Sequence, residues 1–228
     1  MPVPTIKTLF RDVNILDSTG AAPYRGEVLI DNDRIAAVGT VATHRAAGAR
    51  VIDGRGRTLM SGLCDAHTHF TWNNSADLEG LGTMPVAAAF GYPQQAAEAA
   101  GYKHELDCAI TGLEEMHRRG IRVLPGGDYG FAWTPHGTYA RDLQHFVELL
   151  DFTPMEAILA ATAQGGEIML RPDELGKVHP GYLADLLLID GDPLADITVL
   201  QDHDRLHYIM KDGRFHKEHT PDQTAAHP

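Results

Sequence analysis

Two histidines separated by one residue, His67 and His69, are the feature of the sequence that points most directly to chemistry. They follow residues 58–65, a mostly apolar segment that is predicted to be a β-strand. Side chains two residues apart on a strand lie on the same face, so both imidazoles can reach one metal ion, and Asp65 belongs to that face as well. His67 and His69 are therefore candidate metal ligands, with two ordinary core histidines as the alternative.

A carboxylate, Asp128, follows a second short apolar segment, residues 121–124, and the turn sequence Pro-Gly-Gly. Catalytic residues of α/β barrels lie at the C-terminal ends of strands, and a carboxylate beside a metal acts as a ligand or as a general base. An aspartate that only caps a turn is the alternative for Asp128. Farther along the same loop, His136 is a candidate substrate-binding residue, and its alternative is a loop histidine in water.

The elements that must position these side chains begin with β-structure, which is predicted at both ends of the chain. Apolar residues alternate there in short runs that end at turn residues, including a polar hairpin turn at residues 31–33 and an Asp-Gly turn at residues 212–213. Because neither block can bury its own apolar face, the two are expected to share one sheet or sandwich. The predicted strands cover residues 8–16, 27–30, 34–39, 50–54, 182–189 and 206–210.

The middle of the chain alternates helix and strand, which is typical of a parallel α/β fold. An apolar stripe at helical spacing predicts a helix over residues 105–119. A second helix is predicted to begin at the capping box Thr-Pro-Met-Glu, residues 153–156, and to end near residues 165–166. His104 and His117 are 13 residues apart and not at the spacing of a helical ligand pair, so both are expected on the surface of the first helix.

Composition is typical of a soluble globular protein. The 228 residues have a mass of 24.8 kDa, 43% are hydrophobic, and the formal charge of −12 argues against a nucleic-acid or anionic-membrane partner. There is no run of 18 apolar residues and no basic-then-apolar leader, so a cytoplasmic protein without a membrane span is expected, with an exported protein whose leader has been trimmed as the alternative. Cys64 and Cys108 cannot build a disulfide framework. His216 and His219 fall in a polar stretch that is expected to be a frayed tail.

Five segments occur in an order that resembles the metal-dependent amidohydrolase superfamily. Residues 65–69, Asp-Ala-His-Thr-His, are similar to the first-strand signature of this superfamily, and residues 126–130, Gly-Gly-Asp-Tyr-Gly, to its eighth-strand aspartate segment. Residues 135–137 and 153–162 resemble a loop and the last barrel helix of the imidazolonepropionase-like branch, and residues 176–186 resemble the return into a small β-domain. Within this branch the sequence looks nearest to the ochratoxin-degrading amidohydrolases, which are amidase- or carboxypeptidase-like.

The resemblance implies an α/β fold in which a (β/α)8 TIM barrel carries a small β-sandwich formed by the N- and C-terminal segments. Residues 1–58 and 177–215 would be the two parts of the sandwich, with the barrel over residues 59–176 and a tail over residues 216–228. Only strands 1 and 8 of the barrel are recognisable. A TIM barrel takes about 250 residues, so roughly 190 residues of the barrel are not found here, with the junction near residues 86–87. An interior stretch of a longer enzyme that is left out of this sequence is expected, because a barrel without its middle would expose large apolar faces; a genuine deletion is the alternative.

The resemblance also implies a zinc-dependent hydrolase that cleaves an amide or peptide-like C–N bond by a metal-activated hydroxide. His67 and His69 would bind the more buried of two zinc ions. Asp128 would bind zinc and transfer a proton from water to the leaving amine, and His136 would place the substrate. An ochratoxin-type N-acyl amino acid is the candidate substrate, and a cyclic amide of the imidazolone type is the alternative. The family often assembles into homo-oligomers, which is expected here too.

The sequence departs from the superfamily pattern at the metal site. A bridging carboxylated lysine and two further histidine ligands are expected from strands between the first and the eighth, and no residue of this sequence occupies a matching position. Strands 1 and 8 are neighbours in a closed barrel, so His67, His69 and Asp128 can still converge. A non-catalytic, internally deleted scaffold is therefore the third hypothesis, and it predicts a folded protein without amidase activity.

Overall fold

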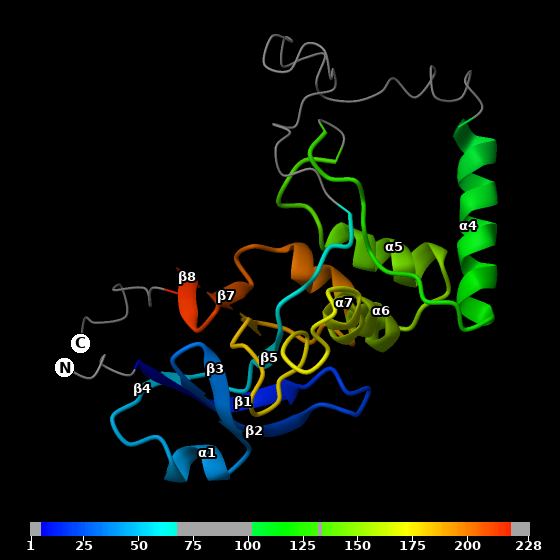
Figure 1. The fold of residues 1–228 in the computed structure, drawn as a ribbon. Helices are drawn as coiled ribbons and strands as arrows, with labels where there is room; N and C mark the ends of the chain where they lie inside the picture. The colour runs from blue at the N-terminus through cyan, green and yellow to red at the C-terminus, as the bar shows by residue number, and fades with distance from the viewer. Residues whose placement is uncertain (1–5, 68–101, 132–133, 220–228) are drawn as a thin grey trace, which may run out of the picture.

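Strands from both ends of the chain form one eight-stranded sheet in the computed structural model, which describes residues 6–67, 102–131 and 134–219 (Figure 1). The strand order is β3-β2-β1-β5-β6-β7-β8, and β4 pairs with β1 off this path. The strands are β1 Lys7–Leu16, β2 Tyr24–Asp31, β3 Arg34–Val38, β4 Arg50–Asp53, β5 Thr58–Ser61, β6 Leu186–Ile189, β7 Leu206–Lys211 and β8 Arg214–Glu218.

The two ends of the chain meet where β5 pairs with β6. These strands are antiparallel, with Leu59 opposite Leu188, and every residue of both strands is buried. The expectation that the terminal β-blocks share one sheet is therefore confirmed. The pairing matters for the candidate site, because β5 leads directly into the segment that carries His67.

The sheet curls so that strands distant in the strand order approach each other. The ring centroid of Phe10 on β1 lies 6.2 Å from that of Tyr208 on β7 and 6.3 Å from that of Phe215 on β8. Arg50 on β4 forms an ion pair with Glu218 on β8, with 2.6 Å between nitrogen and oxygen. One face of the sheet thus encloses an apolar core contributed by both ends of the chain. The residues that were predicted to form a sandwich form this single curled sheet.

Both predicted hairpin turns are present, and both use residue types that tolerate a positive φ. Asn32, with φ 58°, lies in the turn between β2 and β3. Asp212 and Gly213, with φ 49° and 70°, form the turn between β7 and β8. A Cβ at Gly213 would lie 1.8 Å from the carbonyl oxygen of Asn32, so the two turns touch and position 213 needs glycine.

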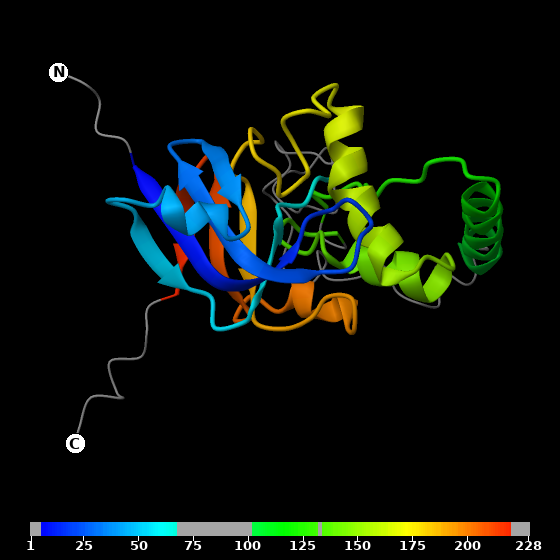
Figure 2. The same cartoon turned by 90° about the horizontal axis from the view of Figure 1, so that it is seen from below.

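Most of the helices lie on one side of the sheet, next to β5 and β6 (Figure 2), whereas the short helix at residues 41–44 contacts β2 and β3. Leu143 and Phe146 of α5 and Ile158 of α6 pack against Met60 of β5 and Leu187 of β6 in a second apolar core. The helices are α1 Val41–His44, α4 Tyr102–Arg118, α5 Arg141–Leu149, α6 Pro154–Ala161, α7 Ala163–Ile168 and the 3-10 helix η1 Ile197–Gln201. None of the helices in the described ranges combines the length and apolar character that a membrane-spanning helix needs.

The predicted capping box is present at the start of α6. The Thr153 hydroxyl accepts a hydrogen bond from the Glu156 amide at 3.2 Å, and the Glu156 carboxylate accepts one from the Thr153 amide at 2.8 Å. Pro154 occupies the first turn, where no amide donor is needed. Sequence alone therefore located this helix start correctly.

Three predicted strand assignments differ from the structure. Residues 121–124 are not in a regular strand, and the strand predicted over residues 58–65 ends at Ser61. The strand predicted over residues 182–189 is reduced to β6, because the amides of Leu183 and Ala184 bond to Glu174 and Asp33 in loops instead of to a strand. In each case the local apolar pattern is real, but the backbone lacks a continuous partner strand.

Two histidine predictions hold only in part, because tertiary contacts involve these side chains. His104 is exposed on α4 as predicted, whereas His117 is 24% exposed and stacks on Phe152 at 3.7 Å between ring centroids. The predicted tail over residues 216–228 begins too early, since β8 continues to Glu218 and includes His216. His219 follows this strand and stacks on His207, with ring centroids 4.2 Å apart.

The predicted barrel is represented in the described residues only by two neighbouring segments, which lead to His67 and to Asp128. No closed barrel is formed by these residues. The junction predicted near residues 86–87 lies outside the described residues, as does His69.

Candidate functional site

The candidate site lies where the segment after β5 runs beside the segment before Asp128. The Ala66 amide donates to the Pro125 carbonyl at 2.8 Å, and the Asp128 amide donates to the His67 carbonyl at 3.1 Å. Because both residue numbers increase from the first bond to the second, the two segments run in the same direction. This is the relation expected between the first and eighth strands of a barrel.

The structure brings His67 and Asp128 together. His67 Nε2 lies 2.9 Å from Asp128 Oδ1, and the two side chains are 62% and 55% exposed. Such exposure leaves both groups accessible to water and to a small molecule. The structure therefore pairs two of the residues that the sequence singled out, from segments that are far apart in the chain.

The donor types of this pair fit part of a zinc site. Zn²⁺ takes imidazole nitrogen and carboxylate oxygen, and a catalytic site needs three protein donors and an open position. Within the described ranges, histidine, cysteine and carboxylate side chains do not gather in groups of three that could hold a metal. A zinc ion bound to this pair would need a third donor from outside these ranges, where His69 lies.

Two glycines allow the close approach of the two segments. A Cβ at Gly126 would lie 3.0 Å from the backbone nitrogen of His67, and one at Gly127 would lie 2.9 Å from both carboxylate oxygens of Asp142. Asp128 follows with φ 54°, a left-handed conformation that aspartate adopts more readily than most residues. The Gly-Gly-Asp sequence is thus required by the geometry of the turn.

Two half-buried carboxylates support this turn from opposite sides. Asp65 accepts a hydrogen bond from the His67 amide at 2.8 Å, and burial together with the nearby charge of Asp142 raises its pKa. Burial also raises the pKa of Asp142, which accepts the hydroxyl of Tyr129 at 2.7 Å. Tyr129 is only 3% exposed, and burial and then Asp142 raise its pKa.

Sequence reasoning assigned no role to Asp142 and Tyr129. Tyr129 was part of the segment that resembles the eighth strand, which is the one signal that could have found it. Asp142 lies in the first turn of α5, a helix that the sequence analysis did not predict.

His136 is held on the loop that follows Asp128. The hydroxyl of Thr134 donates to the Asp128 carbonyl at 3.0 Å, and the Gly130 amide donates to the Thr134 carbonyl at 2.9 Å. His136 Nδ1 lies 2.6 Å from the hydroxyl of Tyr139, whose ring packs against that of Tyr129 with 4.5 Å between centroids. The loop is therefore tied to the candidate site at several points.

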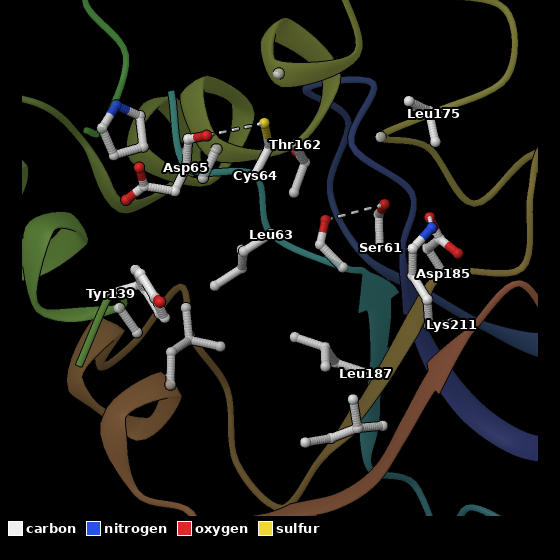
Figure 3. A pocket seen from close by; sticks show the side chains of 18 of the residues that line it. Ser61, Leu63, Cys64, Asp65, Tyr139, Thr162, Leu175, Asp185, Leu187 and Lys211 are labelled. Carbon is white, nitrogen blue, oxygen red and sulfur yellow. Dashed lines mark hydrogen bonds and ion pairs between the residues drawn. The ribbon is translucent and has the colours of Figure 1, made fainter. Parts of the chain in front are cut away.

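A cavity of about 720 Å³ begins beside this site and extends between the sheet and the helices (Figure 3). Figure 3 shows Asp65 and Tyr139 at one side, Leu63 and Leu187 along the wall, and the ion pair of Lys211 with Asp185 at the other side. The volume is within the range of small-molecule sites. Cys64 also lines it, but burial raises the pKa of this thiol, which disfavours the reactive thiolate.

Comparison with known proteins finds a family model that matches part of this chain. Residues 105–215 match the Amidohydrolase family. The chain is 33% identical over 113 residues to ochratoxinase from Aspergillus niger, an alignment that covers 49% of this chain and 22% of the relative. It is 32% identical over 82 residues to imidazolonepropionase from Geobacillus sp. (strain WCH70), covering 33% of this chain and 18% of that relative. The chain thus spans about a fifth of the length of these curated relatives.

Solved structures agree on the fold. The crystal structure of Aspergillus niger ochratoxinase superposes with a TM-score of 0.74 at 14% identity, and the alignment covers 95% of this chain and 97% of that chain. At this identity the likeness concerns the fold alone, and it implies a TIM-barrel-like α/β architecture. The family match over residues 105–215 and the curated relatives support the resemblance to the amidohydrolase superfamily that was found in the sequence.

Proposed function

We propose that the chain is a zinc-dependent hydrolase that cleaves the C–N bond of an amide or peptide-like substrate. The observation that carries the proposal is the 2.9 Å contact between His67 Nε2 and Asp128 Oδ1 on neighbouring parallel segments. The match of residues 105–215 to the Amidohydrolase family supports this reaction class.

His67, His69 and Asp128 would hold the metal. Three donors suffice for one catalytic zinc with an open position, and the second ion implied by the resemblance would need further donors. Bound zinc would lower the pKa of a water molecule towards 7 and polarise the amide carbonyl. The protein residues then act on the proton and on the substrate.

Asp128 is the general base and then the general acid in this proposal. Its carboxylate takes a proton from water and transfers it to the leaving amine, and its exposure gives both molecules access. The contact with His67 fixes the direction of the carboxylate. His136, held by Tyr139 on the loop tied to Asp128, positions the substrate.

The two curated relatives favour different substrates. The name ochratoxinase supports an ochratoxin-type N-acyl amino acid, whereas imidazolonepropionase supports a cyclic amide of the imidazolone type. The longer match is to ochratoxinase, so we propose the N-acyl amino acid first. A homo-oligomer stays a prediction.

The non-catalytic scaffold is the second candidate. It is favoured by one observation, that the described residues do not contain a group of three side chains able to hold a metal. It predicts a folded protein that hydrolyses no amide.

Hydrolysis by the full chain decides between these functions. The protein is incubated with zinc and with ochratoxin A, an acyl-proline dipeptide or a cyclic imidazolone, and product amine or acid is measured. We expect turnover of one substrate class, and we expect Asp128→Asn to lower kcat by about 10²–10⁴-fold. His67→Ala should also abolish turnover, while the exposed His44→Ala on α1 should match the unaltered protein. The absence of any turnover, or full activity of His67→Ala, would overturn the proposal.

A further inference from the structure

We propose that Asp142 and Tyr129 are positioning residues that hold the Asp128 carboxylate in place. The inference rests on the proposed function of Asp128, and it extends that function to two residues outside the metal-ligand set. Asp142 lies on α5, and Tyr129 directly follows Asp128.

The side chain of Asp142 contacts the residues on both sides of Asp128. Its Oδ1 accepts a hydrogen bond from the hydroxyl of Tyr129 at 2.7 Å. A Cβ at Gly127 would lie 2.9 Å from both of its oxygens, so the carboxylate rests against the turn itself. The residues immediately before and after Asp128 are therefore tied to one side chain.

Asp65 orders the opposite segment. Its carboxylate accepts a hydrogen bond from the His67 amide at 2.8 Å, and the carbonyl of the same His67 accepts one from the Asp128 amide at 3.1 Å. Half-buried hydrogen bonds of this kind are costly to break, and a fully bonded network favours a single arrangement.

The core fixes Asp142 in turn. The next residue, Leu143, is 1% exposed, and Phe146 one turn further is 7% exposed within the apolar core between α5 and the sheet. Tyr129 is 3% exposed. The packed helix α5 therefore fixes Asp142, and Asp142 restrains the turn at residues 126–129. The turn sets the position of Asp128 Oδ1, which contacts His67.

Loss of the contacts that Asp142 makes with this turn should make the position of Asp128 less fixed without unfolding the protein. Residues that orient metal ligands typically change metal affinity by about 10–100-fold when they are substituted. Asp142→Asn keeps the size of the side chain but replaces one acceptor oxygen by a donor, and Tyr129→Phe removes only the hydroxyl. Each variant weakens or removes the hydrogen bond between Tyr129 and Asp142.

Tyr182→Phe is the matched control. Tyr182 is 9% exposed, and its hydroxyl donates to the Pro172 carbonyl at 2.8 Å. It belongs to the apolar core enclosed by the curled sheet, away from the α5 core. It therefore reports the general cost of removing a buried tyrosine hydroxyl.

The test measures Co²⁺ binding to the metal-free full chain by its visible absorption, with the ¹⁵N shift of the His67 ring measured without metal. We expect Asp142→Asn and Tyr129→Phe each to weaken Co²⁺ binding by about 10–100-fold. The double variant should lose little more than either single one, because both act on one network. The His67 ring signal should move in the same variants, and Tyr182→Phe should leave both readouts unchanged.

The two readouts separate the inference from the proposed function. Failure of the unaltered protein to bind Co²⁺ would contradict the metal site, and the His67 signal alone would then decide whether Asp142 and Tyr129 position Asp128. An unchanged His67 signal in both variants, or equal losses in Tyr182→Phe, would overturn the positioning role.

Discussion

At the residue scale, the contact between His67 and Asp128 depends on the backbone conformation of the turn that carries Asp128. The left-handed conformation of Asp128 and the missing side chains of Gly126 and Gly127 bring one carboxylate to His67. A bulkier residue in either glycine position would strike His67, Tyr129 or Asp142. The contact is therefore specified by three consecutive residues of the sequence.

In this candidate site, the sequence singled out His67 and Asp128 but not the residues that contact their segments. His67 and Asp128 could be proposed because each follows an apolar segment and lies in a segment that resembles the first- or eighth-strand signature of the amidohydrolase superfamily. Asp142 and Tyr129 could not, since a helical aspartate and a buried tyrosine are common and their contact is set only by tertiary packing. His69 stays a prediction.

Another residue-scale feature, buried His207, predicts a pH dependence of stability. Burial and then the charge of Arg57 lower its pKa; His219 and Lys217 also lower it, and Asp190 opposes them. Its folded-state pKa is thus below the value of about 6.5 expected for the unfolded chain. The unfolded state takes up the proton more readily, so stability falls as the pH falls through 6.5.

Urea unfolding at pH 7.5 and 5.5 measures this effect. We expect the unaltered protein to lose more free energy of unfolding between these pH values than His207→Gln does. Equal losses in the two proteins would show that His207 is not a source of the pH dependence.

At the element scale, some helix starts are determined by neighbouring residues in the sequence, whereas other helices and strands depend on tertiary contacts. The start of α6 was predicted because Thr153, Pro154 and Glu156 satisfy its backbone donors within one turn. The start of α5 was missed because Ala140 offers no side-chain cap, and this helix is stabilised by burial of Leu143 and Phe146. β8 was missed because its polar sequence becomes a strand only by pairing with β7.

The capping box gives the element-scale prediction. We expect Thr153→Ala to lower the free energy of unfolding by about 1 kcal/mol, because the Glu156 amide loses its acceptor. Hydrogen bonds from Thr153 lower the pKa of Glu156. Because this folded-state pKa is depressed, the contribution of Glu156 is present above its unfolded pKa of about 4.3 and is lost as the pH falls below that value.

The variant Glu156→Gln tests the direction in which the contribution of Glu156 to stability changes with pH. Its deficit in free energy of unfolding relative to the unaltered protein should be measurable at pH 7 and should shrink at pH 3 in urea titrations. A deficit that grows at pH 3 would contradict the assignment.

At the scale of the whole molecule, the β5–β6 pair makes one cooperative unit from the two ends of the chain. Leu59 and Leu188 are opposite each other and are 0% and 1% exposed. The shared sheet was predictable because each end alone is too small to bury its apolar residues. The curl that brings Phe10 to Phe215 was not, since it arises from contacts between strands that are not neighbours in the sheet.

Truncation of a buried residue in the β5–β6 pair should destabilise the strands from both ends of the chain. We expect Leu188→Ala to cost about 2–5 kcal/mol. Amide hydrogen exchange should then accelerate in β1 and in β7 together. Acceleration confined to β7 would mean that the two ends of the sheet unfold independently.

Titration of the metal-free chain with Zn²⁺, followed by calorimetry, tests the proposed catalytic centre most directly. We expect specific binding by the unaltered protein and by His44→Ala. His67→Ala and Asp128→Asn should weaken it by more than the roughly 10–100-fold typical of residues that only support a ligand. Absence of specific binding by the unaltered protein, or unchanged binding by both site variants, would contradict a zinc centre built on His67 and Asp128.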